Sequence, residues 1–67
     1  MSEADKLFIK NGWTKITKQG IEEFIDEDKN YISFDLVVEI FTCNCYLSVK
    51  ELKAINLKCK ELGWSEE

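Results

Sequence analysis

The sequence predicts an α+β fold: a short N-terminal helix, an antiparallel β-meander of three to four strands, and a C-terminal helix packed on one face of the sheet. Two patterns carry this prediction, because apolar residues recur at helical spacing near both ends of the chain and alternate with polar residues in between. The 67 residues include 45% apolar side chains, with two Trp, two Tyr and four Phe, which is the composition of a folded protein. We therefore expect one α+β domain spanning residues 1–67.

The N-terminal helix is short. Ser2 is a suitable N-cap, and Asp5 falls in the first turn, where the helix dipole favours an acid. Asn11 and Gly12 then end the helix, and Trp13 follows them. A helix of this length depends on packing for its stability, and its apolar face consists of Ala4, Leu7 and Phe8.

Alternating segments rich in β-branched and aromatic residues predict the strands of the meander. They cover residues 13–18, 21–26, 31–35 and 40–46. Gln19 and Gly20 form one predicted turn and residues 26–30 another. Residues 36–39 contain no Gly, Asn or Pro, so they are compatible either with a turn or with continuous strand.

The C-terminal helix is predicted over residues 49–62. Ser48 and Glu51 form a capping box at its start, and Gly63 is a left-handed C-cap after which Trp64 can fold back onto Cys59. The apolar stripe expected to face the core consists of Val49, Leu52, Ile55, Cys59 and Leu62.

Charge is concentrated in the middle of the chain. Residues 21–39 hold seven acidic side chains and one Lys, although the net charge of the whole chain is only −4. Such asymmetry bears on partners rather than on fold. A solvated acidic turn is one interpretation, and a protein-binding surface is the other. The candidate protein-binding residues are Glu22, Glu23, Asp26, Glu27 and Asp28.

The sequence does not predict an enzyme. It has no His, no Ser/His or Cys/His arrangement and no Gly-rich phosphate loop. Its clustered carboxylates surround a predicted turn rather than a cleft that would separate their pKa values. Lys50, Lys53 and Lys60 lie opposite the apolar stripe, but four Lys in this segment of an acidic chain are too few for duplex binding. We therefore expect no direct binding of nucleic acid.

The three cysteines, Cys43, Cys45 and Cys59, are expected to be free thiols that pack as small apolar side chains. Two of them share one face of a strand, but a structural zinc site usually takes four ligands and the CxxC spacing is missing. No metal or other cofactor is therefore expected. The sequence also lacks a secretion signal and a membrane-length apolar segment, so the expected location is the cytoplasm, without membrane contact.

Several motifs resemble small uncharacterised proteins encoded in phages and prophages of Gram-positive bacteria. They are ADKLF at residues 4–8, GW at 12–13, ISFD at 32–35, ELKAIN at 51–56 and ELGW at 61–64. The middle departs from the pattern, because LVV follows the Phe-Asp pair where such proteins usually have a polar turn. The resemblance implies a phage or prophage origin and a bacterial host cytoplasm, and it implies no particular activity.

Two hypotheses of function follow. The first is a small acidic module that binds a host or phage protein, in its sharpest form inhibiting a host nucleic-acid-handling protein, because an acidic surface can steer towards basic patches. The second is a structural or self-associating role as a homodimer, because a short sheet with an open edge can pair with a second copy.

If the thiols only pack, zinc will neither bind stoichiometrically nor raise the melting temperature of the protein. Calorimetric titration and thermal melting with and without zinc measure both quantities. Tight one-to-one binding with a higher melting temperature would contradict the packing interpretation, because a ligand of the folded state must stabilise that state.

Overall fold

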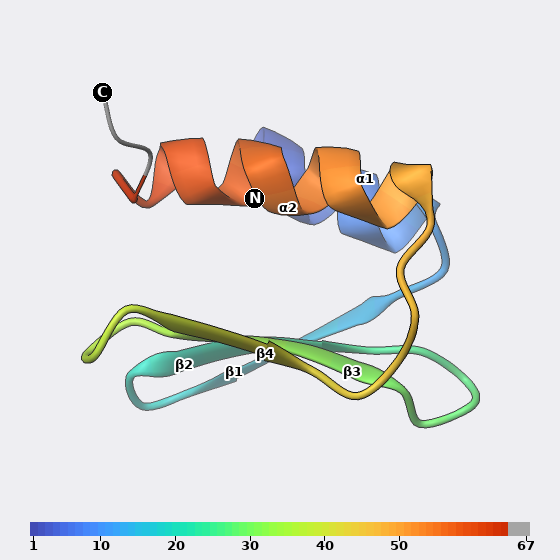
Figure 1. Ribbon diagram of the computed structural model, residues 1–67, viewed down its shortest axis with the longest axis horizontal. Helices are drawn as coiled ribbons and strands as arrows, with labels where there is room; N and C mark the ends of the chain where they lie inside the picture. Colours follow the sequence, from blue (N-terminus) through green and yellow to red (C-terminus); the bar gives the residue numbers. More distant parts are fainter. Residues whose placement is uncertain (65–67) are drawn as a thin grey trace.

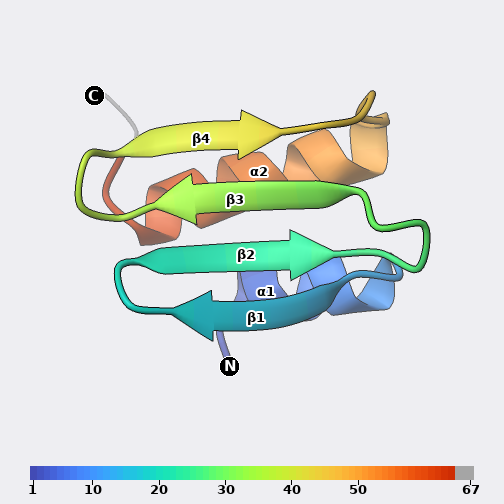
Figure 2. The same cartoon turned by 90° about the horizontal axis from the view of Figure 1, so that it is seen from below.

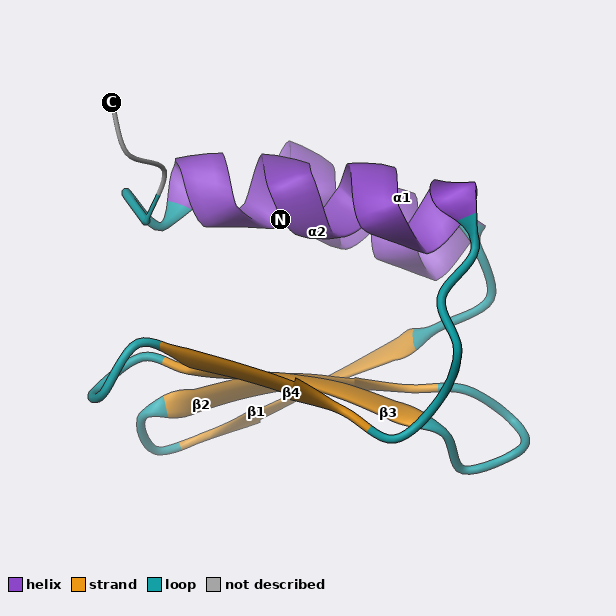
Figure 3. Cartoon of the chain, in the orientation of Figure 1, coloured by secondary structure: helices purple, strands orange, loops and turns teal. Residues whose placement is uncertain are grey.

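Six elements follow one another along residues 1–64, the part of the chain that the computed structural model describes. A helix, four strands and a second helix confirm the predicted α+β fold, in which the helices form one layer and the sheet the other (Figures 1 and 3). The elements are α1 (Glu3–Lys10), β1 (Thr14–Lys18), β2 (Ile21–Ile25), β3 (Tyr31–Asp35), β4 (Ile40–Cys43) and α2 (Val49–Glu61).

The sheet is an antiparallel meander in the order β1-β2-β3-β4. Figure 2 shows α1 behind β1 and β2, and α2 behind β3 and β4, so the helices cover one face of the sheet and leave the other uncovered. The edges of the sheet are β1 and β4. Residues 36–39, compatible with turn or strand from sequence, form the turn between β3 and β4, where Glu39 takes a φ of 58°.

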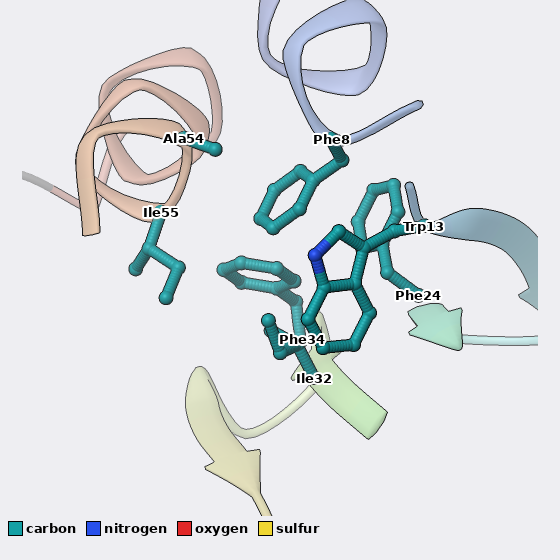
Figure 4. Close-up of a cluster of buried hydrophobic side chains, with 7 residues drawn as sticks. All are labelled: Phe8, Trp13, Phe24, Ile32, Phe34, Ala54 and Ile55. Atoms are coloured by element: carbon teal, nitrogen blue, oxygen red, sulfur yellow. The ribbon is translucent and has the colours of Figure 1, made fainter. Parts of the chain in front are cut away.

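The core lies between the two layers and is largely aromatic. Phe8 of α1 stacks on Phe24 of β2, with their ring centroids 4.1 Å apart, and Phe34 of β3 meets both rings edge-on. Figure 4 shows these rings meeting beneath the two helices, with the Trp13 indole beside them. The buried cluster consists of Phe8, Trp13, Phe24, Ile32, Phe34, Ala54 and Ile55.

The predicted caps are present. Ser2 Oγ accepts a hydrogen bond from the Asp5 N–H at 3.1 Å, and the Ser48–Glu51 capping box begins α2. Gly63, with a φ of 77°, follows the helix, and the Trp64 N–H then donates to the Cys59 carbonyl at 2.8 Å. These local signals place the helix ends within one or two residues of the prediction.

The buried face of α2 differs from the predicted stripe. Val49 is 66% exposed and Leu52 is 47% exposed, whereas Ala54, Ile55 and Lys58 are buried. At 100° per residue, Leu52 lies about 100° around the helix from the centre of this buried face. Because α2 packs against α1 as well as above the sheet, the face that meets both neighbours includes small Ala54 and excludes Leu52.

This arrangement predicts different costs for two truncations on the same helix. Ile55→Ala removes a buried side chain and is expected to lower the free energy of unfolding by ~2–5 kcal/mol. Leu52→Ala removes a half-exposed side chain and should cost less than about 1 kcal/mol. Urea unfolding of both variants measures the difference. Equal losses would contradict the observed rotation of α2.

Candidate functional site

Four charged side chains from four elements meet between the layers, and we call them the inner charge cluster: Asp5 of α1, Lys15 of β1, Glu22 of β2 and Lys58 of α2. The Asp5 carboxylate accepts a hydrogen bond from Lys58 Nζ at 2.9 Å and another from Lys15 Nζ at 2.6 Å. Glu22 completes the ring through ion pairs with Lys58 and, at 3.4 Å, with Lys15. The Oε1 atom of Glu22 makes both of these contacts.

Secondary structure directs each of these side chains inwards. Glu22 lies two residues before buried Phe24 on the same strand face, and Lys15 is the cross-strand partner of Phe24. Asp5 precedes buried Phe8 by one helical turn, and Lys58 follows buried Ala54 by one turn. The Lys58 ammonium also lies 5.9 Å from the centroid of the Phe24 ring.

Two members of the cluster have shifted pKa values. Burial raises the pKa of Asp5, but hydrogen bonds and charge attraction from Lys15 and Lys58 outweigh burial, so the pKa ends below its ordinary value of 3.8. The hydrogen bond to Asp5 raises the pKa of Lys15 above 10.5, against the opposing effect of burial. Both shifts favour the charged forms, as expected of mutually neutralising groups.

The inner charge cluster has the features of a structural set of ion pairs rather than of a catalytic site. Two carboxylates balance two ammonium groups, and Asp5 and Lys58 are only 2% and 3% exposed. A general acid or base needs a side chain that reaches its substrate, whereas the buried pair is already engaged. The cluster therefore fixes the positions of both helices on the sheet.

The structure divides the five predicted protein-binding residues. Glu22 points into the inner charge cluster, while Glu23 lies on the uncovered sheet face, 3.4 Å from Lys18. Asp26 holds its own turn by accepting hydrogen bonds from the N–H groups of residues 28 and 30. Only Glu27 and Asp28 are exposed at the tip of the β2–β3 turn. The acidic segment is therefore not one continuous acidic surface.

A second surface, which the sequence did not single out, lies at the β3–β4 hairpin. We call it the apolar edge surface; its residues are all exposed aliphatic or aromatic side chains, namely Leu36, Val37, Val38, Ile40 and Phe41. Val37 is 78% exposed and Val38 is 58% exposed. Singly exposed apolar residues are ordinary, but three successive exposed apolar residues on one turn, residues 36–38, are typical of interaction surfaces. Ile40 and Phe41 follow the turn and point to opposite faces of β4, with Phe41 against Phe34.

Hydrogen bonds hold the turn of this hairpin in place. The Leu36 N–H donates to the Gly20 carbonyl at 2.8 Å, which ties the turn to the neighbouring β1–β2 turn. Asp35 Oδ1 accepts from the N–H groups of Val37 and Val38 at 3.0 and 3.2 Å. The two valines are thus displayed on a fixed backbone, which lowers the entropy that a partner must remove on binding.

The backbone of β4 is open beside this surface. In an antiparallel ladder, alternate residues direct both backbone groups towards the same neighbour. The Asn44 N–H bonds to the Tyr31 carbonyl, so the register of β3 and β4 also turns Thr42 and Ile40 towards β3. Phe41 and Cys43 consequently direct their N–H and C=O groups outwards, where β4 has no neighbour within residues 1–64.

The two sheet edges differ in charge. Edge strand β1 carries Lys15 and Lys18, and lysines on an edge oppose pairing with another sheet. Edge strand β4 has the sequence IFTC, with no charge and no Pro. The β4 edge therefore lacks the protection that β1 has.

The thiols lie at the end of β4. Cys43 and Cys45, with Asn30, Asn44 and Tyr46, line a shallow depression, and Cys43 Sγ donates to the Cys45 carbonyl at 3.6 Å. Burial raises the pKa values of Cys45 and Cys59, which disfavours their reactive thiolate forms. Across residues 1–64, no three His, Cys, Asp or Glu side chains are grouped to hold a metal ion.

Neither a protein-family model nor a curated protein nor a solved structure matches this chain. Both helices of the described region are too short or too polar to cross a membrane. The geometry points to the apolar edge surface, together with the open backbone of β4, as the candidate functional site.

Sequence signals for both features exist. The two-residue alternation around Phe24 places Glu22 inwards, and helical spacing from Ala54 does the same for Lys58. The apolar turn was visible as the LVV stretch after Phe34-Asp35. The sequence did not reveal that the stretch is a turn, which is what exposes its side chains.

Removing one partner from the inner charge cluster should be costly. Asp5→Asn leaves the buried Lys58 ammonium with Glu22 as its one remaining carboxylate partner among the described residues, and we expect a loss of ~3–5 kcal/mol in unfolding free energy. Glu3→Gln, which removes an exposed carboxylate 3.7 Å from Lys6, is the matched control and should cost less than about 1 kcal/mol. Urea unfolding at neutral pH compares the two, and equal effects would contradict a structural role for Asp5.

The same cluster predicts a dependence of stability on pH. The folded-state pKa of Asp5 lies below 3.8, so its contribution is present above pH 3.8 and is lost as the pH falls through the folded-state value. The pKa of Lys15 is raised, so its contribution is present below pH 10.5 and is lost at higher pH. Unfolding free energies measured from about pH 7 to about pH 3 should fall less steeply in Asp5→Asn than in the wild type. Parallel curves would exclude Asp5 as a source of the acid dependence.

Proposed function

We propose that this protein is a protein-binding module without catalytic activity and that the apolar edge surface is its binding site. The observation that carries the proposal is the display of Leu36, Val37 and Val38, exposed on a turn that three hydrogen bonds hold in place. Leaving such side chains in water has a cost that burial against a partner would recover, at about 25 cal/mol per Å² of apolar surface.

The buried charges support a role other than catalysis. The inner charge cluster is internally neutralised, and the raised pKa values of the Cys45 and Cys59 thiols make them poor nucleophiles. The open β4 backbone offers main-chain hydrogen bonds to an extended segment, a common mode of protein recognition.

The resemblance to phage and prophage proteins favours a host or phage protein as the partner, in the cytoplasm of a bacterial host. Inhibition of a host nucleic-acid-handling protein is the more specific form of this proposal. Glu27 and Asp28 at the β2–β3 turn are the acidic residues left to steer such an approach towards a basic patch. Apolar contacts would supply the affinity, and the acidic turn would raise the rate of association with a basic partner.

Self-association is the second candidate function. The observation that favours it is the sequence of edge strand β4, which contains neither the charged residues nor the Pro that commonly prevent one sheet edge from pairing with another.

The binding site can be tested by capture of partners from host lysate with two matched double variants. Val37→Ser with Val38→Ser removes exposed apolar surface without adding charge, and Glu27→Gln with Asp28→Asn removes charge with little change in shape. We expect the first variant to lose the captured protein and the second to retain it. Capture by the wild type should also persist at high salt, because apolar burial is not screened.

The opposite pattern would contradict the proposal. Capture that survives the serine variant, but is lost on neutralising Glu27 and Asp28 or on adding salt, would transfer the binding site to the acidic turn. Both variants alter exposed side chains of turns, so their melting temperatures should stay close to that of the wild type.

A further inference from the structure

We propose that edge strand β4 pairs with β4 of a second copy of this chain, antiparallel and centred on Thr42, to join the two four-stranded sheets into one continuous sheet. This inference rests on the proposed function, because it names one partner of the same surface. Three features of the chain favour this pairing: the outward backbone groups of β4, the absence of charge on the strand, and the exposed apolar residues at its two ends.

The backbone of β4 selects the register. Only Phe41 and Cys43 direct their backbone groups away from β3, as the ladder between β3 and β4 requires. In the proposed register Phe41 of each chain pairs with Cys43 of the other. The outward N–H and C=O groups of all four residues then form hydrogen bonds across the axis. Shifts that centre the axis on Phe41 or Cys43 pair one of these residues with itself and leave the other beyond the strand of the second copy.

This register is isologous, so each contact occurs twice, as a closed dimer requires. Thr42 lies on the axis and faces Thr42 of the second copy at a non-hydrogen-bonded position, where side chains approach closely and β-branched pairs are favourable. Thr42 is exposed on the uncovered sheet face, and β4 is an edge strand of the sheet (Figure 2).

The same register brings exposed apolar groups together. Because the strands are antiparallel, the loop after β4 of the second copy, which carries Tyr46, comes near the β3–β4 turn, which carries Val38. Tyr46 is fully exposed and Val38 is 58% exposed. A second copy therefore covers side chains at both ends of β4 that otherwise remain in water. Each contact is repeated by the two-fold axis.

Charge does not oppose the pairing, although each chain carries a net charge of −4. From residue 36 to residue 46 the only charged side chain is Glu39. Glu39 precedes β4, so the antiparallel arrangement places the two Glu39 residues at opposite ends of the paired strands. Four strand residues separate them by about 13 Å, beyond the screening length of about 8 Å at physiological salt.

The short strand sets the strength of the dimer. Two paired residues per chain with flanking apolar contacts form a small interface, at the low end of specific protein–protein contacts. We therefore expect dissociation constants in the range of about 10 µM to about 1 mM, typical of weak association. Sedimentation equilibrium of the full chain over that range should show a reversible monomer–dimer equilibrium.

Charge substitution at Thr42 tests the register. Thr42→Lys and Thr42→Glu should each weaken the dimer by about five- to tenfold, because like charges would face each other across the axis. An equimolar mixture of the two variants should form a heterodimer, since Lys then faces Glu. Thr14→Lys is the matched control: it alters the same residue type, exposed on the same sheet face of the opposite edge strand β1, and should leave dimerisation unchanged.

The outcomes separate this inference from the proposed function. A wild-type chain that stays monomeric throughout the concentration series would overturn the second copy as partner. If the Val37/Val38 variant still abolished capture from lysate, the apolar edge surface would remain a binding site, taken by another protein. A dimer unaffected by Thr42→Lys and Thr42→Glu, or one whose two variants fail to combine, would overturn the proposed register.

Discussion

The ion pair between Asp5 and Lys58 joins the two helices and faces the sheet, and the remaining architecture depends on it. A buried ammonium is tolerated only when carboxylates neutralise it, and here Asp5 and Glu22 both contact Lys58. This requirement fixes which side of α2 faces inwards. It brings Ala54 and Ile55 into the core with Lys58 and leaves Val49 and Leu52 outside.

The inner charge cluster also determines which acidic side chains remain for recognition. Glu22 is engaged inside, Glu23 pairs with Lys18 on the opposite sheet face, and Asp26 organises its own turn. The acidic composition of the central segment therefore contributes partly to folding rather than wholly to a surface. The apolar turn between β3 and β4 and the open edge of β4 are the exposed features that contribute least to the contacts within the fold.

The two sheet edges differ because the lysines lie on β1 and none lies on β4. Lys15 serves the inner charge cluster and, with Lys18, places two cations on edge strand β1. Edge strand β4 lies under α2 and away from the cluster, and its strand carries no charge. A meander with one protected edge and one open edge has a direction in which further strands can be added, which is a feature of binding modules that act through β-strand pairing.

The sequence by itself determined the element order and the helix caps, because capping boxes, glycine stops and two-residue alternation are local. Only the tertiary structure decided the rotation of α2, the burial of Lys58 and the exposure of residues 36–38. Each of these depends on pairs far apart in sequence: Asp5 with Lys58, Glu22 with Lys58, and the Leu36 N–H with the Gly20 carbonyl. Periodicity within one element does not contain such information, because an element's buried face is set by the neighbours against which it packs.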